Sequence, residues 1–148
     1  MPAQRKYAAP SFFEKSFNRF LGIIAGAGFG PSYVYRLRVK GRKSGKLYST
    51  PVSIVEINGK KFLVAPRGRT QWVRNAEASG EIALVRGWFN QRFRLRSLQE
   101  NEKPEVLKKY LASYKTAVQR FFPIQPDSTL QSFSEIASGY PVFELVGA

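Results

Sequence analysis

The sequence of 148 residues contains no cysteine and no histidine. Without cysteine the chain has neither disulfides nor thiolate nucleophiles. Without histidine it lacks the base of a Ser-His or Cys-His relay, and without either it lacks the commonest zinc ligands. The composition therefore argues against a zinc enzyme and against a triad hydrolase, and we expect no metal site.

Acidic residues are also scarce, with 10 Asp and Glu against 24 Lys and Arg and a formal net charge of +14. A field of this sign attracts anionic partners. Three classes fit at this stage: a nucleic acid, an acidic membrane surface, or a polyanionic cofactor.

Long apolar runs are missing as well. No segment reaches the roughly 18 consecutive apolar residues of a membrane span. Charged and polar residues, including Glu14 and Arg19, interrupt the aromatic segment near the N-terminus, so it does not resemble a signal peptide. We expect a cytoplasmic protein in which residues 1–148 form one domain with a sizeable core.

The N-terminal segment predicts an amphipathic helix over about residues 11–24, capped by Ser11 and ended by a stretch of glycines before Pro31. Phenylalanines recur on one face, while Lys15 and Arg19 lie between them. Such a helix suits a membrane surface or a cover over a substrate pocket, and packing on the core explains it equally well.

Hydrophobic periodicity and turn signals predict a mainly β fold with helices. The dipeptide Asn58-Gly59 is the strongest hairpin signal in the chain. Strands are predicted over residues 33–40, 47–57, 60–65, 81–86, 91–98 and 140–146, helices over 71–79 and from Asn101 to Phe121, and a single helical turn over 132–137. This pattern favours a small mixed α+β barrel.

Basic residues are concentrated in the first predicted hairpin. They are Arg36, Arg38, Lys40, Arg42, Lys43 and Lys46. The turn over residues 41–46 adds Ser44 and two glycines, so cations and backbone N–H groups could converge on a phosphate or carboxylate. A solvated basic surface explains the same pattern, and both readings stay open.

A second basic segment, residues 66–70, leads into the helix predicted over 71–79. A loop at a helix N-terminus presents unpaired N–H groups to an anion, and Arg67 and Arg69 add positive charge. Trp72 could stack on a planar ring or simply pack the helix onto the barrel.

Taken together, the motifs GRKSG, Thr50-Pro51, the NG hairpin, VAPRG, QWVRN and the terminal YPVFEL resemble the deazaflavin-dependent nitroreductase and quinone reductase family from about Tyr33 onward. The resemblance implies a split β-barrel related to flavin mononucleotide oxidases. It also implies the deazaflavin cofactor F420, which carries a phosphate and an oligoglutamate tail. The expected reaction is hydride transfer to a quinone, nitroaromatic or enone acceptor.

The same resemblance implies which residues bind the cofactor. They are Arg42, Lys43, Ser44 and Gly45 at its phosphate-bearing side chain, Thr50 and Pro51 beside that turn, Ala65, Pro66, Arg67 and Gly68 along the deazaflavin ring, and Trp72 and Asn75 in the helix that closes the pocket. The sequence departs from the family at Tyr48, where many members carry a basic residue, and at Pro66, where some carry serine.

Without histidine, the proton that accompanies the hydride must come from a tyrosine or from water. Tyr114 is the candidate, since the family places aromatic residues from this region over the substrate side of the cofactor. Its position on an apolar helix stripe also predicts a simple packing role.

Other readings stay open. Flavin mononucleotide is the alternative cofactor, and barrels of this kind often form homodimers. The alternative function is a basic protein that binds nucleic acid or anionic lipid. Nucleic acid is not favoured, because the basic residues concentrate at the two segments that a deazaflavin site needs.

Overall fold

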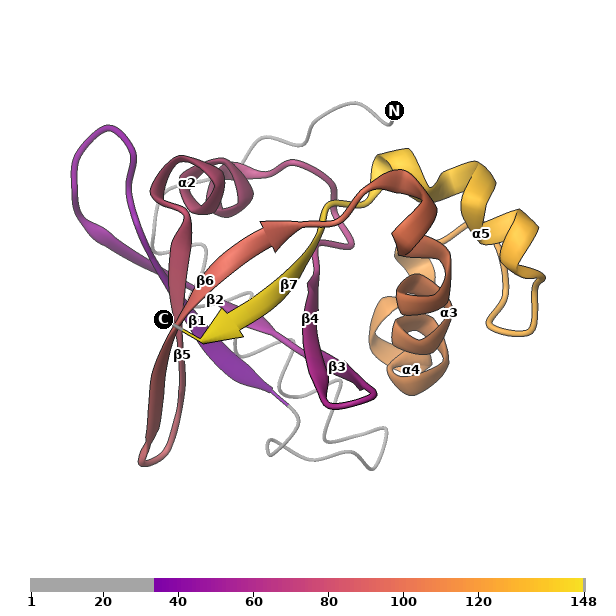
Figure 1. Cartoon of the computed structure of the whole chain (residues 1–148), viewed down its shortest axis with the longest axis horizontal. Helices are drawn as coiled ribbons and strands as arrows, with labels where there is room; N and C mark the ends of the chain where they lie inside the picture. The colour runs from indigo at the N-terminus through magenta and orange to yellow at the C-terminus, as the bar shows by residue number, and fades with distance from the viewer. Residues whose placement is uncertain (1–33, 148) are drawn as a thin grey trace.

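The computed structural model describes residues 34–147, and both Tyr33 and the helix predicted over residues 11–24 lie outside this range. Its centre is an antiparallel sheet of seven strands in the order β2-β1-β5-β6-β7-β4-β3 (Figure 1). The strands are β1 (Tyr35–Lys40), β2 (Leu47–Val52), β3 (Ile54–Ile57), β4 (Lys60–Val64), β5 (Glu81–Arg86), β6 (Phe89–Ser97) and β7 (Val142–Gly147).

Two local predictions are confirmed. Asn58 and Gly59 join β3 to β4 with φ of 53° and 79°, the left-handed backbone that a two-residue hairpin turn requires. Helix α2 (Gln71–Ser79) has the predicted bounds and ends at Gly80, whose φ of 79° and N–H bond to the Ala76 carbonyl form a left-handed C-cap.

The strand predicted over residues 47–57 is interrupted at Ser53, so the prediction of one continuous strand is wrong. Its first half, β2, pairs with β1, and its second half, β3, pairs with β4. Because β2 and β3 are the two edge strands of the sheet, the chain passes from one edge to the other through a single residue. The sheet is thereby curled into a barrel.

Helices pack against only part of this sheet, with α3, α4 and α5 together on one side and α2 apart from them (Figure 1). The bounds are α3 (Lys103–Ser113), α4 (Lys115–Val118) and α5 (Leu130–Ile136), with 3-10 turns η2 (Glu100–Glu102), η3 (Gln119–Phe121) and η4 (Ala137–Gly139). None of the helices within residues 34–147 is both long and apolar enough to cross a membrane.

The long helix predicted to reach Phe121 breaks at Tyr114, which leaves the helical region at φ −125° and ψ 31°. Its hydroxyl donates to the Ile54 carbonyl at 2.7 Å, a contact across 60 residues that a helical pattern cannot reveal. The single turn expected over residues 132–137 is a longer helix, α5. Thr129 caps it, with its hydroxyl accepting from the Ser132 N–H at 3.1 Å.

Two apolar clusters form the core. One fills the barrel, where Leu37, Leu84 and Phe143 are almost fully buried. The other lies between the sheet and helices α3 to α5, around Leu107 and Phe133. Strand β4 serves both clusters because its successive side chains alternate in direction.

Arg96 ties the end of β6 to the helical layer. Its guanidinium donates to Glu102 at 3.0 and 3.1 Å and to Glu144 of β7 at 2.9 Å. The hydrogen bonds from Arg96 and from the Gln99 N–H hold the pKa of Glu102 below its ordinary value. The charged form of Glu102 is therefore the form that stabilises this junction.

Candidate active site

The turn over residues 41–46 is closed by its own hydrogen bonds. The Gly41 N–H donates to the Lys46 carbonyl at 2.7 Å, and the Lys46 N–H donates to the Ser44 hydroxyl at 3.2 Å. Gly45 has a φ of 76°, which favours glycine at this position. The ordered turn leaves Lys43 exposed to solvent.

Asn75 on α2 holds this turn from the side. Its Oδ1 accepts from the Arg42 backbone N–H at 3.1 Å and from Arg42 Nη1 at 2.7 Å. The Asn75 side chain is buried, so both bonds form in a partly shielded environment. Arg42 and Asn75, which are 33 residues apart and were both named as cofactor-binding residues from the sequence, are therefore in direct contact.

The loop over residues 66–70 is a compact turn at the start of α2. Gly68 has a φ of 85°, and its N–H donates to the Ala65 carbonyl at 3.2 Å. Thr70 occupies the N-cap position, but its buried hydroxyl has no hydrogen-bond partner within the described part of the chain. Arg69 pairs with Glu77 at 2.7 Å, which leaves Arg67 as the loop cation nearest the helical layer.

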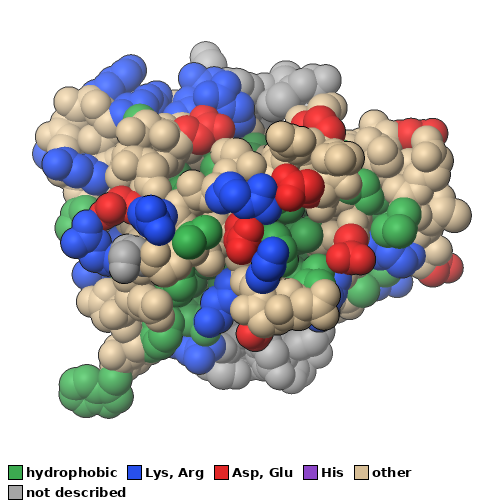
Figure 2. Space-filling model, in the orientation of Figure 1, with side chains coloured by type: hydrophobic (Ala, Val, Ile, Leu, Met, Phe, Trp, Pro, Cys, Tyr) green, Lys and Arg blue, Asp and Glu red, His purple; other side chains and the backbone are tan. Residues whose placement is uncertain are grey.

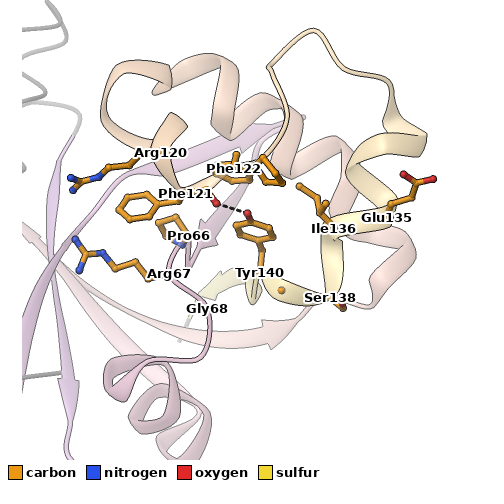
Figure 3. Close-up of a pocket in the computed structure, with 12 residues that line it drawn as sticks. Pro66, Arg67, Gly68, Arg120, Phe121, Phe122, Glu135, Ile136, Ser138 and Tyr140 are labelled. Carbon is orange, nitrogen blue, oxygen red and sulfur yellow. Dashed lines mark hydrogen bonds between the residues drawn. The ribbon is translucent and has the colours of Figure 1, made fainter. Parts of the chain in front are cut away.

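This loop forms one wall of a cleft of about 470 Å³, which we name the aromatic cleft (Figure 3). Its lining includes Pro66, Arg67 and Gly68 on one side and Phe121, Phe122 and Tyr140 on the other. The cleft therefore lies where the barrel meets the helical layer.

Two guanidinium groups flank the Phe121 ring. The carbon at the centre of the Arg67 guanidinium is 5.1 Å from the ring centroid, and that of Arg120 is 4.8 Å away. Figure 3 shows both cations at one end of the cleft and Glu135 at the other. The cation-rich end suits a ligand that carries negative charge.

Stacked rings make the rest of the aromatic wall rigid. The rings of Phe122 and Tyr140 lie 4.5 Å apart and nearly parallel. The Tyr140 hydroxyl donates to the Phe121 carbonyl, and burial raises the pKa of Tyr140 above its ordinary value. Tyr140 therefore keeps its proton at neutral pH, and a flat apolar ligand meets a preformed surface.

The predicted site residues are distributed unevenly. Arg42 and Asn75 are in contact, and Pro66, Arg67 and Gly68 line the aromatic cleft. The other residues named from the resemblance are Lys43, Ser44 and Gly45 in the exposed turn, Thr50 and Pro51 partly exposed on β2, and Ala65 and Trp72 buried in the barrel core.

Tyr114 lies inside the core, with 5% of its surface exposed. Its hydroxyl is hydrogen-bonded to the Ile54 carbonyl, and its ring contacts that of Tyr110 at a centroid distance of 5.5 Å. Tyr114 is also absent from the lining of the aromatic cleft. This environment is the one expected for a packing role, and the expected role of Tyr114 as a proton donor is left to the kinetic test below.

The sequence reasoning missed Arg120, Phe121, Phe122 and Tyr140 as lining residues. Arg120 and Phe122 flank Phe121, which the helical pattern assigned to an apolar face. Tyr140 lies in the strand predicted over residues 140–146, but β7 begins only at Val142. The available signal was the aromatic residues directly before a proline, in Phe121-Phe122-Pro123 and in Tyr140-Pro141, since proline ends regular structure and leaves neighbouring rings at a layer boundary.

The model of the F420H(2)-dependent quinone reductase family matches residues 15–124, well over half of the chain. The chain belongs to this family. Membership confirms the resemblance seen in the sequence and makes the chain an F420-dependent oxidoreductase. It gives no support to the alternative of a non-enzymatic nucleic-acid or lipid-binding protein. No curated protein matches the chain significantly.

Solved structures share the family's fold. An F420-H2 dependent reductase (FDR-A) is 23% identical with a TM-score of 0.52, covering 76% of this chain and 93% of its own. A structure described only as a domain-swapped dimer is 22% identical with a TM-score of 0.56, covering 93% and 99%.

A third similar structure is the protein Atu2129 of Agrobacterium tumefaciens str. C58, described as of unknown function. It is 19% identical with a TM-score of 0.54 over 76% of this chain, which spans 47% of the Agrobacterium protein. At such identities these likenesses concern the fold, and the predicted split β-barrel is confirmed.

Replacing Asn75 tests the link between the turn and α2. Asn75→Ala leaves the Arg42 N–H without its acceptor, and we expect the free energy of unfolding to fall by about 1–3 kcal/mol in urea denaturation. Asn75→Asp keeps an acceptor oxygen and should retain most of that stability. The exposed Asn90→Ala is the matched control, and equal stability of Asn75→Ala and Asn90→Ala would contradict the role of the link.

Tyr114→Phe separates the two roles of that side chain. Because its hydroxyl is bound to a buried carbonyl, we expect a loss of about 1–3 kcal/mol in unfolding free energy with kcat preserved. A proton donor would instead show a fall in kcat of roughly 10²–10⁴-fold with cofactor affinity unchanged. Steady-state kinetics beside denaturation of the same variant distinguishes these outcomes.

Proposed function

We propose that this enzyme transfers a hydride from reduced F420 to a quinone, nitroaromatic or enone acceptor bound in the aromatic cleft. The observation that carries the proposal is the composition of the cleft walls. One wall is the loop with Pro66, Arg67 and Gly68, which by family resemblance runs along the deazaflavin ring. The other wall presents Phe121, Phe122 and Tyr140, which suit a flat apolar acceptor.

The charges on this side of the barrel fit the cofactor. The ion pairs among the described residues occupy Arg69, Arg92, Arg96 and Lys103. Lys43 and Arg67 are therefore available for a phosphate or a carboxylate.

When bound, F420 supplies the hydride, so the protein must bind and orient the two reactants. Arg42 and Lys43 would bind the phosphate-bearing side chain of the cofactor at the turn over residues 41–46. Asn75 would hold Arg42 in place for this contact. Arg67 and Gly68 would position the ring beside the cleft. The remaining residues carried over from the family, Ser44, Gly45, Thr50, Pro51, Ala65 and Trp72, would shape or support this pocket.

The proton comes from solvent in this proposal. The hydroxyl of Tyr140 in the cleft is committed to the Phe121 carbonyl, and that of Tyr114 lies in the core. The chain contains no histidine, and the carboxylate in the cleft lining, Glu135, lies at the end opposite the two arginines. Water that enters the cleft beside the acceptor is then the source that this geometry supports.

We also propose that residues 1–148 form a single domain and that the enzyme is cytoplasmic.

We further propose that the enzyme forms a homodimer, because one of the similar solved structures is a domain-swapped dimer. Sedimentation velocity on the full chain measures the oligomeric state.

Cofactor binding is tested by fluorescence titration of the full chain with F420 beside flavin mononucleotide. We expect F420 to bind more tightly, and Lys43→Ala to raise its Kd by roughly 10–150-fold, because a charge-assisted contact contributes about 1.5–3 kcal/mol. The control Lys115→Ala removes an exposed lysine of another region and should leave the Kd unchanged. Preferential binding of flavin mononucleotide would identify it as the cofactor, and an unaltered Kd in Lys43→Ala would remove Lys43 from the site.

The acceptor site is tested by the rate at which reduced F420 is oxidised by a quinone and by a nitroaromatic compound. Phe121→Ala should lower kcat/KM for the acceptor by about 2–10-fold, because an aromatic contact of this kind is worth about 0.5–1.5 kcal/mol. The Kd for F420 should stay the same, and the exposed Leu130→Ala serves as the control. Equal kinetics in both variants would place the acceptor outside the aromatic cleft.

A further inference from the structure

Strands β2, β1, β5 and β6 turn one face toward the barrel core and the other outward. Directly paired residues point to the same side of an antiparallel sheet. The pairs Arg38 with Ala83 and Ala83 with Arg92 therefore place two arginines on the outward side, while Leu37 and Leu84 point into the core. We name this outward side the basic face.

The basic face is strongly cationic. Its charged members on these four strands are Arg36, Arg38, Lys40, Arg92, Arg94, Arg96 and the acid Glu81. Arg96 is paired with Glu102 and with Glu144 of the neighbouring β7. Glu81 forms an ion pair with Arg92. Arg38, Lys40 and Arg94 are exposed, so positive charge dominates the surface between β2 and β6.

Large apolar side chains stand at two ends of the basic face. Trp88, at the tip of the β5–β6 hairpin, has a relative exposure of 103%, and Leu47 at the start of β2 has 70%. Figure 1 shows this hairpin projecting beyond the rest of the sheet, and Figure 2, in the same orientation, shows hydrophobic atoms standing clear of the surface at that tip. Complete exposure of a tryptophan costs hydrophobic free energy in water.

We propose that the basic face and Trp88 dock the enzyme on a membrane surface that contains anionic phospholipids. Tryptophan favours the boundary between lipid headgroups and hydrocarbon, where its ring is apolar and its N–H can still hydrogen-bond. Arginine and lysine near that boundary are attracted by anionic headgroups. The hairpin tip would insert Trp88, while Arg38, Lys40 and Arg94 would face the headgroups.

Charge and surface chemistry favour this occupant over two others. A second copy of the chain would bring like charges together if the same face were used on both copies. A single-stranded nucleic acid is bound by successive aromatic platforms, whereas the basic face carries Ala83 and Val85 between its cations. A phospholipid surface requires only distributed positive charge and an interfacial anchor.

The test is flotation of the full chain with phosphatidylcholine vesicles, with and without phosphatidylglycerol. We expect binding that depends on phosphatidylglycerol and weakens with salt. The chain has two tryptophans, and Trp72 is buried, so a blue shift of emission on binding reports the transfer of Trp88 into lipid. The expected reductions in affinity are at least about tenfold for Trp88→Ser and roughly 30-fold for Arg38→Gln/Arg94→Gln.

The charge-matched control is Lys60→Gln/Lys115→Gln, which removes two exposed lysines away from the basic face and should bind nearly as well as the wild type. The proposal is overturned if the full chain does not float with anionic vesicles. It is overturned as well if Trp88→Ser and Arg38→Gln/Arg94→Gln both bind like the control, or if an oligonucleotide is retained in preference to vesicles. F420 titration of each variant measures the proposed function separately, because neither substitution lies in the proposed cofactor pocket.

Discussion

The continuous segment from β2 to β3 supplies both edge strands of the sheet, and the rest of the structure depends on this connection. Ser53 marks the point where pairing with β1 gives way to pairing with β4. Because β2 and β3 are the two edge strands and only Ser53 separates them in the chain, the covalent backbone holds both edges of the curled sheet close to each other. This closure leaves strand β4 buried on both faces, between the barrel core and the helical layer, and so sets where the aromatic cleft can form.

Three hydrogen bonds between residues far apart in the sequence hold loops and helices in place on the sheet. Asn75 accepts from the Arg42 backbone N–H in the cationic turn, Tyr114 donates to the Ile54 carbonyl at the start of β3, and Tyr140 donates to the Phe121 carbonyl. Each bond satisfies a backbone group that would otherwise be costly to bury. Together they position the turn, the strand break and the cleft wall without any charged catalytic side chain.

The parts of the fold that depend on neighbouring residues were predictable from the sequence. Helix α2, its glycine cap and the Asn58-Gly59 turn follow from local backbone preferences. The interruptions at Ser53 and Tyr114 depend on partners elsewhere in the chain, so apolar periodicity continued through both. The cationic segments of the site were recognised by composition and resemblance. Its aromatic wall was missed because Phe121 and Tyr140 meet only through the tertiary fold.

The Arg96 junction makes the attachment of the helical layer sensitive to acid. Glu102 has a folded-state pKa below its ordinary value, so its contribution to stability is present above that ordinary value and is lost as the pH falls through the folded-state pKa. Protonation would weaken the hold of Arg96 on η2, the turn that begins α3. In acid the helical layer therefore loses one of its polar ties to the end of β6, while its apolar packing on the sheet does not depend on the charge of Glu102.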